Sequence, residues 1–269
     1  MGTTGAGHRA TANISVITAI EDASQTTGLE LCLDAGDIAS WPGSGESWLD
    51  LSGNGYDFFL GTGTGGDARD PTFNGTPGAL SSAEYWSSDG GDLFTYDTTN
   101  ETWMQNLHKD NAAYSFLWVV YPVAGINNWA FGDSANSNAN VGLATNVSNA
   151  SNATNNISNG SGTAYARQAG QSGYGAAGAE WQRVSTYLDE AGNLAAWARN
   201  DTLFSNVSGS YSSPSAADAT YTFQIGSPGN SVAQIPSGAR YAVLCVWSTV
   251  LGQTNLKSVW NGIRGRWGL

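Results

Sequence analysis

Two tryptophans in polar surroundings are the residues of this sequence that are best suited to bind a ligand. Trp103 and Trp129 each lie within a stretch of polar residues. An aromatic ring can stack on the apolar face of a sugar while neighbouring amides bond to its hydroxyls, so we expect Asn106 and Asn128 to serve beside them. The alternative is that each tryptophan caps the hydrophobic core, because Trp is highly buried on average. The sequence predicts a carbohydrate site at these residues and leaves core packing open.

Three aspartates form the densest group of hard oxygen ligands. Asp89, Asp92 and Asp97 lie within a segment rich in Asp and Gly. Ca²⁺ takes carboxylate and carbonyl oxygens from flexible loops of this kind. The same residue types also favour tight turns with solvated side chains. Two interpretations follow, a Ca²⁺ site or a set of turn residues.

Catalytic chemistry has little support in the sequence. Neither of the two histidines, His8 and His108, is accompanied by a Gly-x-Ser-x-Gly elbow. Glycoside hydrolysis needs two carboxylates across the bond to be cut, and the pair Asp189-Glu190 is typical of a hairpin turn instead. We predict that the protein is not an enzyme.

The elements that must position these residues are short strands. Residues 114–121 form an uncharged run of aromatic and β-branched residues that stops at Pro122. The run is too short for a membrane span and too uninterrupted for a half-exposed strand, so it predicts a central strand buried on both faces. A further strand is expected at 29–34, and a hairpin around 189–193.

Composition favours one all-β domain in a chain of 269 residues. The 35 Gly, 11 Trp and 11 Tyr suit many short strands joined by tight turns. The net charge of −12 disfavours nucleic acid and anionic membranes as partners, and it favours neutral ligands or cations. We find neither a secretory signal pattern nor a window apolar enough for membrane insertion, so we expect the chain to fold in a cytoplasm.

Three further features leave alternatives open. Residues 1–28 are predicted to form an arm that docks on a partner or a second copy, a frayed terminus being the alternative. The Asn- and Ser-rich region 134–173 is either an ordered surface excursion of short β segments or a flexible loop. Cys32 and Cys245 lie in apolar runs and are expected to be buried free thiols. The alternative is a disulfide, which would require the first and last strands to be neighbours and is unexpected in a reducing compartment.

Several turn and packing motifs carry a family resemblance. Leu31-x-Leu33-Asp34-Ala35 is followed by Trp48-x-Asp50-Leu51-Ser52-Gly53-Asn54-Gly55 and by an aromatic-Asp-Gly-Gly-Asp segment within 84–94. With these motifs, residues 29–269 resemble the concanavalin A-like, laminin-G/pentraxin-like jelly-roll superfamily, especially its bacteriophage virion proteins. The resemblance implies an all-β, two-sheet antiparallel jelly-roll sandwich over 29–269, with a short C-terminal helix, the N-terminal arm 1–28, and Ca²⁺ as an ion that members often hold. It also implies strands at 194–199, 222–226 and 239–247 and a helix over 251–260 with Thr254 or Asn255 as its N-cap.

Together these features predict a non-enzymatic virion structural protein of a tailed phage or phage-like particle. It would be a head decoration, head fibre or tail-associated module that binds host surface polysaccharide and leaves the host cytoplasm by lysis. Its partners would be other virion subunits, with a homo-oligomer as one arrangement of the arm; nucleic acid and membrane insertion are not expected. The alternatives are an architectural capsid or tail cement protein that binds no sugar, and a polysaccharide-degrading enzyme with carboxylates near 89–97.

Overall fold

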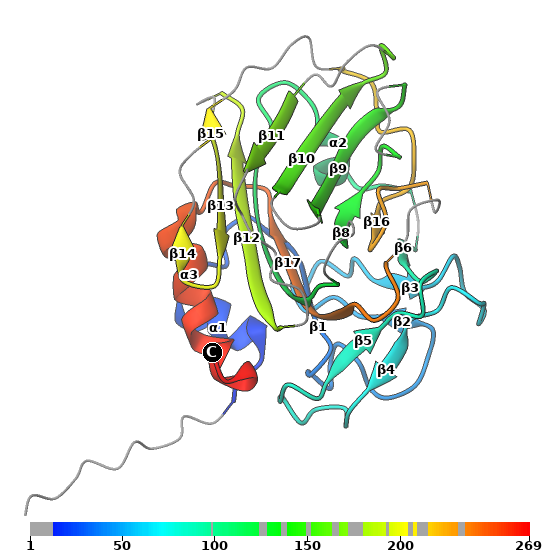
Figure 1. Ribbon diagram of the computed structural model, residues 1–269, viewed down its shortest axis with the longest axis vertical. Coiled ribbons are helices and arrows are strands. Elements are labelled where there is room, and N and C mark those ends of the chain that lie inside the picture. Colours follow the sequence, from blue (N-terminus) through cyan, green and yellow to red (C-terminus); the bar gives the residue numbers. More distant parts are fainter. Residues whose placement is uncertain are drawn as a thin grey trace, which may run out of the picture.

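The protein is a two-sheet β-sandwich with helices on the outer face of one sheet (Figure 1). The structure is a computed structural model that describes residues 13–97, 99–123, 128–135, 139–148, 152–162, 167–171, 180–191, 194–203, 207–208, 215–230 and 235–269. All strand pairs in these residues are antiparallel. The predicted all-β jelly-roll sandwich is confirmed.

The first sheet has β7 and β17 at its centre. Its order is β14-β13-β12-β7-β17-β5-β4, with β1 also on β17 and β15 also on β13. The strands are β1 (Leu29–Asp34), β4 (Thr72–Asn74), β5 (Tyr85–Ser87), β7 (Ala113–Tyr121), β12 (Gln182–Asp189), β13 (Leu194–Arg199), β14 (Thr202–Leu203), β15 (Val207–Ser208) and β17 (Arg240–Trp247). β7 is buried at every position except its two ends, as the uncharged run predicted. The predicted hairpin is the β12–β13 pair, in which Asp189 lies opposite Leu194.

The second sheet takes three strands from the polar region 134–173. Its order is β11-β10-β9-β8-β16-β6-β3-β2. The strands are β2 (Ser47–Trp48), β3 (Phe58–Leu60), β6 (Phe94–Tyr96), β8 (Asn128–Gly132), β9 (Val141–Ser148), β10 (Asn152–Asn159), β11 (Arg167–Gln171) and β16 (Gln224–Ile225). Leu143 and Val147 on β9 alternate toward the core with Ala153 and Ile157 on β10, and all four are buried. The described part of this region therefore forms integral strands rather than an excursion.

Apolar side chains fill both faces of the central strands. Phe116 and Trp118 of β7 lie in the core between the sheets. Leu117 and Val119, which alternate with them, lie in a second cluster under the helices α1 (Val16–Asp22) and α3 (Gly252–Ile263). The double burial explains why β7 carries no charge or polar alternation.

Part of the predicted arm belongs to the packed body of the domain. Val16, Ala19 and Ile20 on α1 are buried against the second cluster. Gly262 on α3 lies so close that a Cβ there would stand 2.8 Å from the Cβ of Ala19. Residues 1–12 lie outside the described residues, so the docking role of the arm stays a prediction.

The C-terminal helix differs from the prediction at its start. α3 begins at Gly252, which rules out Thr254 and Asn255 as its N-cap, and it continues into the 3₁₀ helix η1 (Arg264–Trp267). The start is set by tertiary contact, because the backbone N–H of Leu251 donates to Ser115 Oγ of β7 at 2.9 Å. None of the helices in the described residues is long and apolar enough to cross a bilayer.

The two cysteines lie directly opposite each other on β1 and β17. Cys32 pairs with Cys245 in the ladder, and their Sγ atoms are 3.2 Å apart. Both are buried free thiols, as predicted. Burial raises the pKa of Cys32 well above its usual value, with the neighbouring Cys245 adding to the rise.

A buried ion pair joins the first strand to the C-terminus. Both guanidinium Nη atoms of Arg266 donate to the carboxylate of Asp34, at 2.7 and 2.9 Å, and both side chains are fully buried. The backbone N–H groups of Val16 and Gly36 donate to the same carboxylate, at 3.0 and 2.9 Å. The packing is tight, because a Cβ on Gly36 would stand 2.2 Å from Arg266 Nη2.

We predict that Asp34→Asn destabilises the fold strongly. It leaves the Arg266 guanidinium buried without a counter-charge, which costs about 3–5 kcal/mol in the free energy of unfolding measured by denaturant titration. The matched control is Asp201→Asn, which breaks the half-exposed pairs with Lys257 and Arg264 and is expected to cost below about 1 kcal/mol. Equal losses in the two variants would contradict the prediction.

A second buried carboxylate has an incomplete set of partners. Asp133, after β8, is fully buried; its Oδ1 accepts the Leu143 N–H at 2.7 Å, and in the described part of the chain its Oδ2 has no hydrogen-bond partner. Burial raises the pKa of Asp133 to about 8 from its ordinary 3.8, because a charged carboxylate is disfavoured away from water. The folded protein therefore keeps a proton on Asp133 at pH values where the unfolded chain has released it.

Because Asp133 keeps this proton in the folded state, its contribution to the free energy of unfolding decreases as pH rises. The contribution of Asp133 is fully present below about pH 4 and declines as pH rises to about 8, because the unfolded chain then binds fewer protons. We predict that the free energy of unfolding of the wild type, minus that of Asp133→Asn, falls across this range in denaturant titrations at a series of pH values. Asp22→Asn, at an exposed position, is the control and should give a flat difference; a flat difference for Asp133→Asn would refute the pKa assignment.

Candidate functional site

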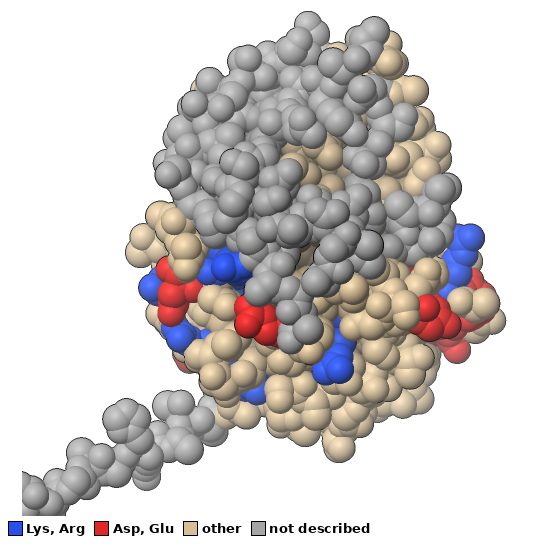
Figure 2. Space-filling model, viewed as in Figure 1, with Lys and Arg blue, Asp and Glu red and all other residues tan. Residues whose placement is uncertain are grey.

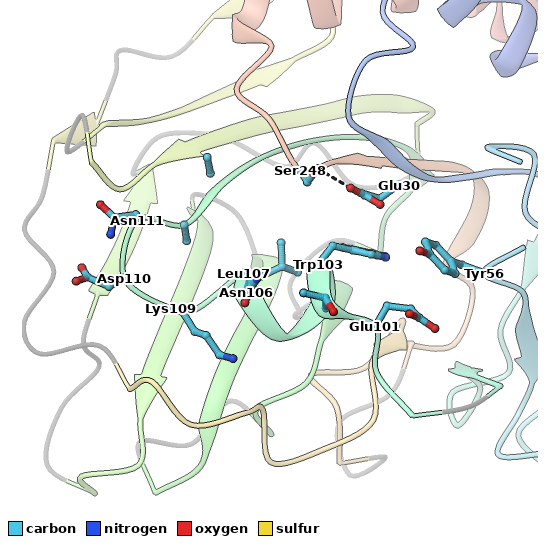
Figure 3. Close-up of a pocket in the computed structure, with 13 residues that line it drawn as sticks. Glu30, Tyr56, Glu101, Trp103, Asn106, Leu107, Lys109, Asp110, Asn111 and Ser248 are labelled. Atoms are coloured by element: carbon cyan, nitrogen blue, oxygen red, sulfur yellow. Dashed lines mark hydrogen bonds between the residues drawn. The ribbon is translucent and has the colours of Figure 1, made fainter. Parts of the chain in front are cut away.

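A pocket of about 610 Å³ opens at the end of the sandwich where β1 and β7 begin and β17 ends. Its lining comes from β1, the turn before β3, the short helix α2 (Thr102–Asn106), the turn into β7 and the residue after β17 (Figure 3). The lining residues are Glu30, Tyr56, Glu101, Thr102, Trp103, Asn106, Leu107, Lys109, Asp110, Asn111, Ala112, Ala113 and Ser248. Two residues predicted for sugar binding, Trp103 and Asn106, thus line one pocket.

Two aromatic side chains contribute to the pocket wall. The Trp103 ring lies 5.5 Å from Phe223, edge-on, and 6.2 Å from Tyr56, measured between centroids. Trp103 is only 7% exposed, and its indole Nε1 has no hydrogen-bond partner among the residues that the structure describes. In Figure 3 this nitrogen points toward Tyr56, whose ring is partly exposed. A buried N–H without a partner is costly, so this edge of the pocket suits a polar ligand group or a water molecule.

Glu30 reaches the pocket because of a β-bulge. In the β1–β17 ladder Leu29 pairs with Trp247 and Leu31 with Val246, so Glu30 is the extra residue of the bulge. A bulge changes the direction of a side chain relative to the regular alternation of a strand. Glu30 Oε1 accepts the hydroxyl of Ser248 at 2.6 Å.

The turn at 52–55 holds the bulge in place. Ser52 Oγ and Asn54 Nδ2 both donate to the carbonyl of Glu30, each at 3.0 Å. Asp50 fixes the turn itself by accepting the backbone N–H groups of Ser52 and Tyr56, at 2.9 and 3.2 Å. The same motif therefore orients both Glu30 and Tyr56.

Glu101 lies at the start of α2 as its N-cap residue. Its Oε1 accepts the phenolic hydroxyl of Tyr96 at 2.8 Å. The second carboxylate oxygen of Glu101 has no hydrogen-bond partner among the described residues, and the same is true of the second oxygen of Glu30. The pKa of Tyr56 is raised, first by burial and then by the nearby carboxylates of Glu101, Glu30 and Asp50. These carboxylates therefore lie close enough to Tyr56 to disfavour its ionised form.

A loop segment around residue 218 holds the end of α2. The backbone N–H of Ala219 donates to Gln105 Oε1 at 2.6 Å. The imidazole of His108 is buried, with Nε2 2.8 Å from the carbonyl of Ala217, and burial lowers its pKa. Lys109 Nζ lies 2.8 Å from Asp218 Oδ1. His108 is therefore structural, and the lysine at the pocket rim already has a counter-charge.

The charges around the pocket are mainly acidic. Its lining carries three carboxylates, Glu30, Glu101 and Asp110, and one ammonium, that of Lys109. On the face of the molecule shown in Figure 2, the described Lys and Arg side chains are interspersed with Asp and Glu. The described residues on that face therefore show no broad basic patch.

The structure separates the predicted sugar ligands. Asn106 is exposed at the pocket. Asn128 is fully buried, and its side-chain amide bonds to both the N–H and the carbonyl of Val123, at 2.9 and 3.0 Å. The prediction that Asn128 binds sugar is therefore wrong, because its polar atoms hold the chain before β8. Trp129 lies on β8, but its side chain is outside the described residues.

The predicted Ca²⁺ ligands do not form one site. Asp89 and Asp92 are adjacent, with the Asp89 N–H donating to Asp92 Oδ2 at 3.0 Å, whereas β6 separates them from Asp97. Burial is the main cause that raises the pKa of Asp92 to about 6. Among the described residues no group of three or more His, Cys, Asp or Glu is arranged to hold a metal ion. The described residues therefore do not bring Asp89, Asp92 and Asp97 together as one group of ligands, and Ca²⁺ binding stays a prediction.

Sequence reasoning missed Glu30, Tyr56 and Glu101. The motif that positions Glu30 and Tyr56 was visible in the sequence as the turn at 52–55, but its role depends on pairing between β1 and β17. Glu101 could have been found from its position beside Trp103 in a polar stretch.

Comparison with known proteins supports the fold. The chain matches no family model and no curated protein. Its structure is similar to the binding domain of botulinum neurotoxin DC in complex with rat synaptotagmin II, with a TM-score of 0.58 and 11% identity over 88% of this chain and 52% of that chain. It is also similar to the botulinum neurotoxin serotype D binding domain, with a TM-score of 0.58 and 14% identity over 89% and 52%.

A third similar structure concerns botulinum neurotoxin type C, whose cell entry depends on interaction with two ganglioside molecules. Its TM-score is 0.58 at 13% identity, over 90% of this chain and 53% of that chain. This chain thus spans about half the length of each of these structures. At such low identity the likeness establishes the shared β-sandwich fold, and function must be argued from the site.

Proposed function

We propose that the protein is a non-enzymatic carbohydrate-binding module and that the pocket at α2 is its site. One observation carries the proposal: a sugar-sized pocket combines the rings of Trp103 and Tyr56 with an exposed amide, Asn106, and the carboxylates of Glu30 and Glu101. Aromatic rings pack against the C–H face of a pyranose, and amides and carboxylates bond to its hydroxyls. Mostly preformed concave sites with a few converging polar groups are typical ligand sites.

The structural neighbours give secondary support. Among proteins with a similar sandwich, one depends on two ganglioside molecules for cell entry and another was solved in complex with SialylT. Glycan recognition is therefore compatible with this architecture. The particular ligand is decided by the pocket, because the shared fold does not transfer a site.

We also propose that the module belongs to a phage virion, as a head decoration, head fibre or tail-associated protein. The support is the resemblance of residues 29–269 to virion members of the concanavalin A-like superfamily. An architectural cement role is the alternative, and it is distinguished by retained particle binding without sugar binding.

We predict that Asn106→Ala weakens glycan binding about tenfold while leaving the melting temperature unchanged, because the side chain is exposed at the pocket. Tyr56→Ala should weaken binding at least as much through loss of the aromatic wall. The measurement is a glycan array followed by titration calorimetry on the glycan that binds. Asn261→Ala on the exposed side of α3 and Tyr85→Ala beside Trp181 are the matched controls, with binding expected to stay at the wild-type level.

The same samples decide between binding and hydrolysis. Two carboxylates in one sugar-sized pocket are also what glycoside hydrolysis requires, so reducing ends are assayed alongside binding. The binding proposal predicts a ligand that remains intact. Release of reducing ends that disappears in Glu101→Gln would replace the proposal with an enzymatic function, and an array without any bound glycan would contradict it.

The virion proposal predicts that deletion of residues 2–12 abolishes incorporation into particles while the domain stays folded. The deletion stops before α1, because α1 is buried in the domain and its loss would unfold the protein. Incorporation is measured by co-sedimentation of the protein with particles, and circular dichroism confirms the fold. Normal incorporation of the deletion variant would show that this segment is not the attachment element.

A further inference from the structure

The pocket combines aromatic rings with carboxylates that have unused hydrogen-bonding capacity. One carboxylate oxygen of Glu30 accepts a hydrogen bond from the Ser248 hydroxyl, and one of Glu101 accepts a hydrogen bond from the Tyr96 hydroxyl. In Figure 3 the two carboxylates are drawn on either side of the Trp103 indole, with Tyr56 beyond it. The remaining oxygens can therefore accept hydrogen bonds from a ligand that lies against the rings.

The rings add an attraction for positive charge. The face of Trp or Tyr carries negative quadrupole density and binds a cation within about 6 Å of the ring centre. The centroids of Trp103 and Tyr56 are 6.2 Å apart, so one small cationic group can contact both rings while bonding to a carboxylate. An ammonium also provides three donors and no acceptor, which matches acceptor-only carboxylates.

The Lys109 ammonium, the only one among the described lining residues, does not cancel this attraction. Lys109 is paired with Asp218 at 2.8 Å, a residue outside the pocket lining. Asp110 adds a further carboxylate at the rim. The rise in the pKa of Tyr56, to which Glu101 and Glu30 contribute, is consistent with a negative potential inside the pocket.

The Trp103 indole is a donor beside this place. Trp103 is more than nine-tenths buried and lines the pocket, and its Nε1 has no hydrogen-bond partner among the described residues, as is also true of the core tryptophans Trp48 and Trp118. A sugar hydroxyl or ring oxygen next to the ammonium would supply the missing acceptor after a small shift of the ring. The pocket thus offers acceptors for a cation and a donor for a neighbouring oxygen.

We infer that the pocket recognises an amino sugar with a free, protonated amine, held between the Glu30 and Glu101 carboxylates against the rings of Trp103 and Tyr56. The inference rests on the proposed carbohydrate-binding function and narrows its ligand class. A sugar bearing a carboxylate is disfavoured, because its charge would be desolvated beside three carboxylates of the lining. An N-acetylated sugar loses the charge and keeps only the stacking and hydroxyl contacts.

The test compares three soluble probes by titration calorimetry at about pH 6, where a free amine is protonated. They are the trisaccharide of glucosamine, the trisaccharide of N-acetylglucosamine and sialyllactose. We expect the glucosamine probe to bind about tenfold or more tightly than its N-acetylated counterpart, since a charge-assisted hydrogen bond is lost on acetylation. Sialyllactose should bind most weakly.

Pocket variants separate specific recognition from general attraction to an acidic protein of net charge −12. Glu30→Gln and Glu101→Gln keep an Oε1 acceptor for Ser248 and Tyr96, so both variants should fold with the wild-type melting temperature. Each should reduce the preference for the amine, and the double variant should abolish it. Glu46→Gln, an exposed position outside the pocket, is the matched control and should retain the full preference.

The outcomes distinguish this inference from the function on which it rests. Equal or tighter binding of the N-acetylated probe, lost in Tyr56→Ala, would overturn the amino-sugar inference and keep the carbohydrate site. A preference for the amine that survives the double variant would overturn it as well, because the attraction would then arise elsewhere on the surface. Absence of binding by every glycan of the array and by all three probes would overturn both.

Discussion

The buried ion pair between Asp34 and Arg266 is the contact on which the two ends of the described chain depend. Both charges are fully removed from water, so they are tolerable only while each remains paired and hydrogen-bonded. The Asp34 carboxylate also accepts the first backbone N–H of α1, from Val16, and that of Gly36. One carboxylate thus requires β1, α1 and the C-terminal η1 to be in place together. The helical layer and the first sheet are expected to form as one cooperative unit.

The same strand that anchors the ion pair at one end supplies the pocket at the other. β1 ends at Asp34 and carries Glu30 near its start, where the bulge against β17 changes the direction of the side chain. The turn at 52–55 bonds to the Glu30 carbonyl and leads directly to Tyr56. The pocket is therefore built on a paired strand and a hydrogen-bonded turn. Such a site keeps its geometry without a ligand, which limits the ordering cost of binding.

The likeness to known structures concerns the fold, and the chemistry of the pocket is that of this chain's own residues. A β-sandwich is shared with botulinum neurotoxin binding domains at TM-scores of 0.58, but identity is only 11% and 14% for the two binding domains compared. The pocket at α2 combines two rings with carboxylates, and its lysine is already paired. Loops and strand ends supply the contacts of the pocket and the core supplies only their support, so the shared fold does not determine the chemistry of the pocket.

Local pattern was enough to determine the fold class and part of the site. The uncharged run 114–121 predicted the doubly buried central strand, and the polar context of Trp103 indicated the pocket. Both predictions depend only on the order of apolar and polar residues along the sequence. The register of β1 on β17 cannot be read from the sequence pattern. The sequence therefore could not predict the bulge, which directs Glu30 toward Ser248, a partner 218 residues away. Asn128 has the same residue type as Asn106, yet its amide is used by the backbone of its own loop. Sequence determined which polar and aromatic side chains the chain offers, and tertiary structure decided which of them lie exposed at the pocket, because hydrogen bonds within a loop or between strands bury others.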